Sequence, residues 1–196
     1  MGRVVMSVSV SLDGFSTGPE VSVDQPMGAG GERLHEWLFA DDMDRIDAEV
    51  ARERRAASGA VLIGRRMFEL GVGPWGDTPF AMPCFVVTHR ARTDLPMASG
   101  TFVFVTDGIE RALQLAREAA GERDVQILGG ADIQQQYLRA GLVDEIDLQL
   151  VPVLLGAGTR LFDKLAIDPI APIELERVRL AGTPHVTHMR LGVRRR

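Results

Sequence analysis

The fold is decided by the stretch Val125-Gln126-Ile127-Leu128-Gly129-Gly130-Ala131-Asp132-Ile133, in which an apolar run ends in glycine and a helical pattern follows at once. A second stretch, Ala60-Val61-Leu62-Ile63-Gly64-Arg65-Arg66, has the same design. A short continuous apolar run bounded by glycine is typical of a strand that is covered on both faces. Each stretch therefore predicts a buried strand whose carboxyl end turns directly into a helix.

Further apolar runs extend this pattern along the chain. Alternating residues from Val4 to Val10 predict a first strand, which Asp13-Gly14 closes as a turn. We expect further strands at 84–88, 101–105, 145–151 and 186–193, helices at 32–39, 41–57, 65–70, 109–120 and 132–140, and loops at 17–31 and 71–83. Strands that alternate with helices at this spacing predict an α/β fold with a largely parallel sheet covered on both faces.

The composition is that of a folded globular protein. The 196 residues are 45% hydrophobic and 25% charged, and we expect a single domain over residues 1–196. The formal net charge of −5 argues against a nucleic-acid partner. No apolar run approaches the roughly 18 residues that span a bilayer, so no membrane partner is expected. The single cysteine, Cys84, begins an apolar run and fits a buried position in a cytoplasmic protein.

The two glycine turns have the chemistry of phosphate sites. Free backbone N–H groups at a helix start, the positive end of the helix dipole and a glycine that permits close approach together favour an anion. Arg65 and Arg66 add charged donors to the first turn. The alternative is that each glycine serves turn geometry alone.

A third basic segment, Thr88-His89-Arg90, follows the apolar run at 84–88. A hydroxyl, an imidazole and a guanidinium at the end of a strand suit the 2′-phosphate that distinguishes NADP from NAD. The alternative is a solvated loop with scattered positive charge. The remaining histidines, His35, His185 and His188, show no metal-ligand spacing, so no metal is expected. His185 and His188 fall on a segment that we expect to be an edge strand.

Five motifs in this order resemble the dihydrofolate-reductase-like superfamily, and most closely the C-terminal reductase domain of the bacterial riboflavin-biosynthesis deaminase-reductase. They are Ser11-Leu12-Asp13-Gly14, Ile63-Gly64-Arg65-Arg66, Val87-Thr88-His89-Arg90, Leu128-Gly129-Gly130 and Val151-Pro152-Val153-Leu154-Leu155-Gly156-Ala157-Gly158. The resemblance runs across nearly the whole chain. It implies a three-layer α-β-α fold, with a mostly parallel central sheet and an antiparallel C-terminal strand.

The resemblance also implies an NADPH site across the carboxyl ends of the strands. The residues that it assigns to the cofactor are Gly64, Arg65, Arg66, Thr88, His89, Arg90, Gly129, Gly130, Ala131, Asp132 and Ile133. The first group would hold pyrophosphate and ribose, the second the adenosine phosphate, and the third the nicotinamide half. This agrees with the rule that ligands of open α/β sheets lie beyond the carboxyl ends of the strands.

The substrate is expected between the first strand, the short helix at 32–39 and the late loop. Asp13 and Glu36 are the candidate catalytic residues, since relatives keep an acid near each position. Asp13, Trp37, Val153 and Leu154 are the candidate substrate-binding residues. Asp13 equally fits a turn aspartate that bonds the backbone, and Trp37 equally fits the core.

These features predict a free-standing reductase, because the zinc-binding His/Cys/Cys pattern of the deaminase half is missing. It would transfer hydride from NADPH to a small heterocycle, pterin-like or pyrimidine-like, or to a carbonyl compound. The alternative is an inactive nucleotide-binding or sensor module of the same fold. The resemblance and the apolar run from Leu148 to Val151 also predict a homodimer.

Overall fold

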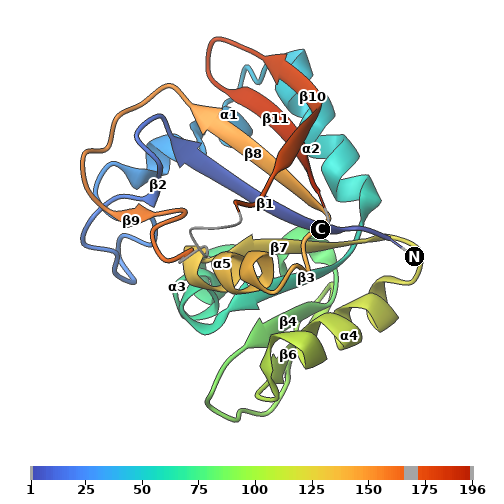
Figure 1. Ribbon diagram of the computed structural model, residues 1–196. Coiled ribbons are helices and arrows are strands. Elements are labelled where there is room, and N and C mark those ends of the chain that lie inside the picture. The colour runs from blue at the N-terminus through green and yellow to red at the C-terminus, as the bar shows by residue number, and fades with distance from the viewer. Residues whose placement is uncertain (1, 166–171, 195–196) are drawn as a thin grey trace.

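A nine-stranded sheet forms the centre of the molecule in the computed structural model, which describes residues 2–165 and 172–194 (Figure 1). The strand order is β10-β11-β8-β1-β7-β3-β4-β6-β5. The strands are β1 (Val4–Ser11), β3 (Ser58–Gly64), β4 (Cys84–Val87), β5 (Leu95–Pro96), β6 (Thr101–Val105), β7 (Asp124–Gly129), β8 (Glu145–Val151), β10 (Leu175–Gly182) and β11 (Thr187–Val193). A small second sheet pairs β2 (Phe15–Thr17) with β9 (Thr159–Arg160).

Most neighbouring strands run parallel. The pairs from β8 through β1, β7, β3 and β4 to β6 are all parallel, whereas β11 is antiparallel to β8 and β5 is antiparallel to β6. The expected mostly parallel sheet with an antiparallel C-terminal strand is therefore confirmed.

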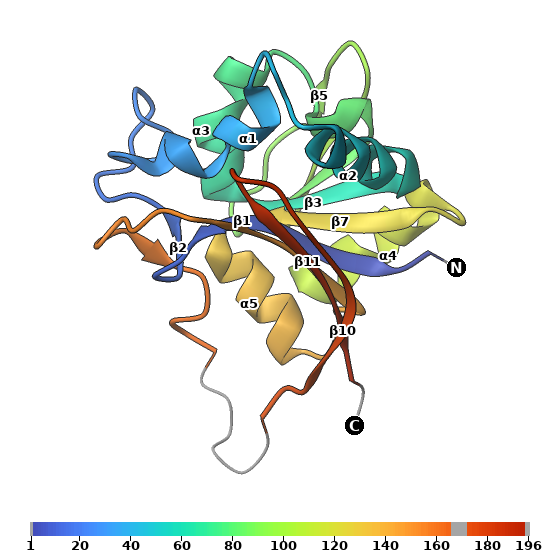
Figure 2. The ribbon, with the colours of Figure 1, turned by 90° about the horizontal axis from the view of Figure 1, so that it is seen from above.

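Helices cover both faces of the sheet (Figure 2). The short α1 (Glu36–Phe39), α2 (Arg45–Ala57) and α3 (Arg65–Trp75) lie on one face, and α4 (Gly108–Ala120) and α5 (Ala131–Arg139) lie on the other. Two 3-10 turns, η1 (Gly31–Leu34) and η2 (Pro79–Ala81), complete the first layer. This is the three-layer α/β architecture that the sequence predicts. In the part of the chain that the structure describes, no helix is long and apolar enough to cross a bilayer.

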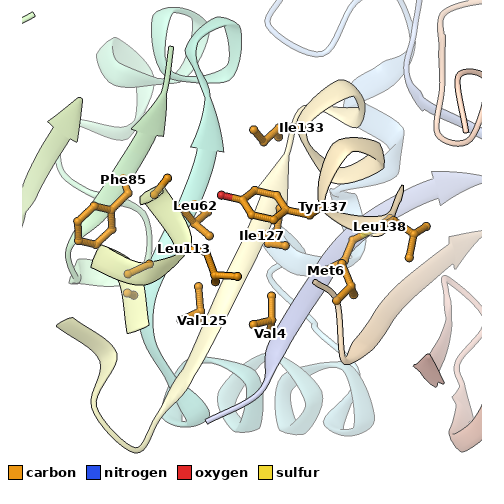
Figure 3. Packing of buried hydrophobic residues seen from close by; sticks show 14 of the residues in the cluster. Val4, Met6, Leu62, Phe85, Leu113, Val125, Ile127, Ile133, Tyr137 and Leu138 are labelled. Atoms are coloured by element: carbon orange, nitrogen blue, oxygen red, sulfur yellow. The ribbon is translucent and has the colours of Figure 1, made fainter. Parts of the chain in front are cut away.

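The main core lies between the sheet and the α4–α5 layer (Figure 3). Val4 and Met6 of β1 point toward this layer, because the side chains of a strand alternate between its faces. Tyr137 of α5 is fully buried among them, and its hydroxyl donates to the Ile109 carbonyl at 2.8 Å. This packing fixes α5, and with it the glycine turn that precedes α5.

Three helices differ from the sequence prediction by more than a residue at one end. The helix expected at 32–39 is divided into η1 and α1. The helix expected from Asp41 begins at Arg45, where the Asp44 carboxylate caps it by accepting from the Ile46 amide at 2.7 Å. The loop expected at 71–83 is helical as far as Trp75, in spite of Gly71, Gly73 and Pro74. Gly71 has a packing role, since a Cβ there would lie 2.3 Å from the Trp75 ring.

The C-terminal strands of the sheet also differ from the sequence prediction. The strand at 186–193 was expected to close the sheet, but β10, which was not predicted, forms the edge and β11 lies inside. Charged and apolar residues alternate irregularly in β10, whose pairing shifts between Arg177 and Arg179, so no strand period is visible there. The expectation that His188 lies on an edge strand is therefore wrong, since β10 and β8 flank β11 on both sides.

Candidate functional site

Five strands end side by side at one edge of the sheet. Across this edge their last residues follow in the order Val151, Ser11, Gly129, Gly64 and Val87. Each of these residues belongs to one of the five sequence motifs. The edge is therefore the candidate site, as expected for the carboxyl ends of a parallel sheet.

The two glycine turns meet at the middle of this edge. Ile63 of β3 pairs with Gly129 of β7, and a Cβ on Gly64 would lie 3.7 Å from the Ile133 side chain and 3.8 Å from the Gly129 oxygen. Gly129 has a φ of +134°, which only glycine adopts readily, and its peptide bond to Gly130 is cis. A Cβ on Gly130 would meet nothing within 4 Å, so the backbone there faces open space.

Two long helices begin at these turns, α3 at Arg65 and α5 at Ala131. Their first N–H groups have no partner within the helix, and both helix dipoles have their positive ends here. The arrangement can bind a bridged anion that spans the two helix starts, such as a pyrophosphate.

The arginines of the first turn are not equally placed. Arg65 is partly buried and its Nη1 contacts both carboxylate oxygens of Glu69 at 2.6 Å, one turn along α3. Arg66 is exposed, and its Nη2 donates to the Val21 carbonyl at 3.3 Å. Arg66 is therefore the freer charge for an incoming phosphate.

The third basic segment lies next to the Gly64 turn, since Val87 pairs with Gly64. Thr88 is buried, and its hydroxyl accepts from the Arg90 amide at 3.0 Å. This bond turns the chain at the end of β4, so His89 and Arg90 are exposed there. The eleven candidate cofactor residues thus lie at or just after the carboxyl ends of three adjacent strands, β7, β3 and β4.

Asp13 joins the end of β1 to the late loop. Its carboxylate accepts from the Ser11 hydroxyl at 2.6 Å and from the amides of Leu155 at 3.2 Å and Gly156 at 2.7 Å. These bonds, above all that from Ser11, lower the pKa of Asp13 to about 2. The group is an anion near neutral pH, so it orders the loop and has no proton to donate.

The other substrate candidates surround Trp37. The indole is 3% exposed, packs with Leu34 and Val151, and donates from Nε1 to the Ser9 hydroxyl at 3.3 Å. Val153 packs against the same cluster, whereas Leu154 is 70% exposed. The core alternative for Trp37 is thus what its contacts show, and its role toward a substrate stays a prediction.

Glu36, the first residue of α1, lies at the surface. Its carboxylate lies 3.4 Å from Arg33, and both side chains are more than half exposed. An exposed ion pair of this kind contributes little energy.

The sequence interpretation missed a buried polar layer beneath α2. His188 Nε2 lies 2.8 Å from Asp47 Oδ1, and the two side chains are 4% and 1% exposed. Arg54 of α2 donates to Ser7 at 2.9 Å and to Gln149 at 3.3 Å. The available signal was a polar residue at every second position of three strands. These residues are Ser7 and Ser9 of β1, Asp147 and Gln149 of β8, and His188 and Arg190 of β11. Within residues 2–165 and 172–194, no group of histidine, cysteine or carboxylate side chains could hold a metal ion.

The sequence matches a known family over most of its length. The model of the RibD C-terminal domain matches residues 3–187. The chain belongs to this family. A family relative in sequence, the uncharacterised protein YyaP of Bacillus subtilis (strain 168), is 26% identical over 178 residues, covering 82% of this chain and 80% of the relative.

Solved structures show the same fold as this family member. A pyrimidine reductase-like protein from Corynebacterium diphtheriae has a TM-score of 0.65 at 15% identity, covering 99% of this chain and 93% of that chain. Dihydrofolate reductase from Enterococcus faecalis, solved with NADP(H), has a TM-score of 0.59 at 13% identity, covering 97% and 96% of the two chains. The expected dihydrofolate-reductase-like fold is confirmed.

Proposed function

We propose that the protein is an NADPH-dependent reductase. The observation that carries this proposal is the meeting of two glycine turns and two helix starts at the carboxyl edge of the sheet. The family gives independent support, because related folds include a reductase solved with NADP(H). When bound, the cofactor would supply the hydride.

The residues at the edge fit this cofactor in shape and charge. Gly130 leaves open space in front of the backbone, and the starts of α3 and α5 would hold the pyrophosphate. Arg66, His89 and Arg90 are exposed and would bind the 2′-phosphate and neighbouring oxygens. Arg65 would join them by exchanging its contact with Glu69 for a phosphate.

The substrate would lie beyond the nicotinamide, over the Trp37 cluster and the late loop. A small apolar patch with Val153 and Leu155, bordered by the Asp13 anion, suits a flat heterocycle of the pterin or pyrimidine type, or a small carbonyl compound. Ring packing against apolar side chains and a few polar contacts would orient the carbon that accepts hydride.

A glycine substitution tests the cofactor site. Gly130→Ala adds a methyl group where no protein atom lies within 4 Å, at a φ of −68° that alanine adopts. The methyl group would occupy the space of the pyrophosphate, so we expect NADPH affinity to fall about tenfold or more, equal to about 1.4 kcal/mol. The measurement is an NADPH fluorescence titration, with a thermal melt to verify folding.

Gly73→Ala is the matched control, because its Cβ is equally free of contacts but lies on α3 away from the edge. It should leave NADPH affinity unchanged. Equal affinity in Gly130→Ala and the wild type would refute the site. An assay of NADPH oxidation, with dihydrobiopterin, 5-aminouracil or diacetyl as the probe substrate, would then distinguish a reductase from an inactive binding module. A binding module would bind NADPH without oxidising it.

A further inference from the structure

A buried side-chain amide lies next to the Gly129 turn. Gln134 belongs to α5 and is fully buried. Its backbone N–H donates to the Gly130 carbonyl at 3.3 Å, and a Cβ on Gly129 would lie 4.0 Å from its Nε2 atom. The backbone and the side chain of Gln134 therefore both lie against the glycine turn.

The same amide joins two strands of the sheet. Nε2 of Gln134 donates to the Ser7 carbonyl of β1 at 3.1 Å and to the Ile127 carbonyl of β7 at 3.2 Å. A side-chain NH2 group carries two hydrogens, so it can make both bonds at once. These bonds fasten α5 to the sheet between β1 and β7.

Strands β1 and β7 stop pairing at this point. Their parallel pairing ends with Met6 and Ile127, although β1 continues to Ser11 and β7 continues to Gly129. Figure 1 shows the two strands diverging toward their carboxyl ends. On its other side, β1 stays paired with β8 as far as Ser11. The divergence is therefore confined to the side of β1 that faces the glycine turn.

The hydrogen-bond ladder shows which group Gln134 replaces. The Val125 amide donates to the Arg3 carbonyl at 2.9 Å, and bonds of a parallel ladder repeat every second residue along each strand. If this series continued, the Gly129 amide would donate to the Ser7 carbonyl. The Ser7 carbonyl accepts from Gln134 instead. The side-chain amide thus takes the place of the Gly129 amide, and Gly129 is free to form its turn with a φ of +134°.

Fold stability alone does not account for a glutamine at this position. Its Oε1 atom is buried and has no hydrogen-bond partner among the residues that the structure describes. An unpaired buried acceptor is unfavourable. A methionine would fill a similar volume beside the core residues Ile133 and Tyr137 without such an acceptor. The part of Gln134 that needs explaining is therefore its NH2 group, which holds β1, β7 and the turn together.

We propose that Gln134 is a positioning residue for the nicotinamide half of the cofactor; this rests on the proposed reductase function. The turn at Gly129 and Gly130 is the part of the site that would face that half. Gln134 fixes the place of this turn relative to β1. Hydride transfer depends on accurate placement of the reacting ring, so a shift of the turn would weaken both binding and reaction.

The adenosine half of the cofactor provides an internal reference. It would bind Arg66, His89 and Arg90, which lie just after β3 and β4. The side-chain bonds of Gln134 are to β1 and β7 instead. The fragment 2′,5′-ADP contains the adenosine half without the nicotinamide, so its binding should not depend on the amide of Gln134.

Gln134→Met tests the proposal, because it removes the NH2 group and keeps an unbranched side chain of similar length. We expect NADPH affinity to fall about tenfold, as for the loss of a hydrogen-bonded contact. The affinity for 2′,5′-ADP should change less than about twofold, because its site is separate. A fluorescence titration measures the first affinity and titration calorimetry the second. A merely structural role would not produce this difference between the two ligands.

Gln135→Met is the matched control on the same helix. Gln135 is 3% exposed, and its Oε1 accepts from the Lys164 amide at 2.7 Å. This variant also loses a bond between a side chain and the backbone, but the bond involves neither β1 nor β7. Both affinities should stay as in the wild type. Unchanged NADPH affinity in a folded Gln134→Met protein, or an equal fall for 2′,5′-ADP, would overturn the proposal.

NMR of the ¹⁵N-labelled wild-type protein tests the same proposal without a substitution, and it decides the matter if Gln134→Met does not fold. NADPH should shift the side-chain Nε2–H signals of Gln134, whereas 2′,5′-ADP should leave them in place. A shift with both ligands, or with neither, at saturating concentrations would overturn the proposal. A wild-type protein that does not bind NADPH would instead refute the proposed function.

Discussion

Asp13 at the end of β1 is an anchor for the late loop. It holds the amides of Leu155 and Gly156, while the Ser11 hydroxyl donates to the same carboxylate and accepts from the Phe15 amide at 2.9 Å. One carboxylate thereby ties together the first strand, the turn after it and the loop after β8.

Asp13→Asn tests this role. The amide keeps one acceptor and loses the charge, so we expect a melting temperature that is lower by a few degrees at pH 7. The folded pKa of about 2 lies below the ordinary value of 3.8, so the carboxylate stabilises the fold above about pH 4 and loses this effect as pH falls through 2. The gap between the two melting curves should close over that interval.

The exposed Glu36→Gln is the control and should melt like the wild type across the same interval. A gap between Asp13→Asn and the wild type that stays constant from pH 7 to about pH 2 would show that the charge of Asp13 contributes nothing.

For single residues, the sequence reveals local motifs better than it reveals contacts between residues that are far apart in the chain. Gly64, Gly129 and the Thr88 segment stand next to strand ends, so their position could be read from local pattern. Asp47 and His188 are 141 residues apart, and only the insertion of β11 beside β8 brings them together. A long-range contact of this kind leaves no local signal, which is why the pair was missed.

Among the elements, α3 combines two glycines with opposite roles. A Cβ on Gly73 would meet nothing, whereas a Cβ on Gly71 would lie 2.3 Å from the ring of Trp75. Gly73→Ala should therefore raise the free energy of unfolding by about 0.5–1 kcal/mol, as expected in an exposed helix. Gly71→Ala should raise the free energy of unfolding by less, or lower it, because the Trp75 indole must move to make room for the new methyl group.

Chemical denaturation of the two variants measures this difference, and the tryptophan emission reports the ring. An equal increase in the free energy of unfolding for both substitutions would mean that Trp75 does not pack on Gly71. The comparison uses one helix and one type of substitution, so helix propensity cancels between the variants.

The continuous apolar runs of β3, β4 and β6 were predicted nearly to their ends, and β6 matches its expected range. Burial on both faces imposes such runs, so the sequence records them. The start of α2 depends on one cap at Asp44, and α3 continues through Gly71, where the absence of a Cβ leaves room for the Trp75 ring. Edge strand β10 is exposed over most of its length, so hydrophobic patterning does not mark it.

For the whole molecule, we propose a homodimer. The run from Leu148 to Val151 lies on interior strand β8, so the sequence basis for this prediction changes. The edge strand β10 instead exposes Leu175, Val178 and Leu180 by 43%, 55% and 54%. An exposed apolar edge strand favours association.

Sedimentation velocity at micromolar concentration should show a dimer, and Leu180→Glu should convert it to a monomer. Val23→Glu, at a loop residue that is 69% exposed, should leave the dimer intact. A wild-type protein that sediments only as a monomer would contradict this assignment.

The meeting of the two glycine turns also links ligand binding to folding. Gly64 and Gly129 come from distant parts of the chain and become neighbours only when β3 and β7 pair in the correct register. In an unfolded chain, or in one whose strands pair in the wrong register, the two glycine turns therefore do not form an anion site. An anion bound at this site would stabilise the native state alone. At a concentration 100 times its Kd, such a ligand would add about 2.7 kcal/mol to the free energy of unfolding. The cofactor would then act as a folding ligand, and its concentration in the cell would set how much of the protein is folded.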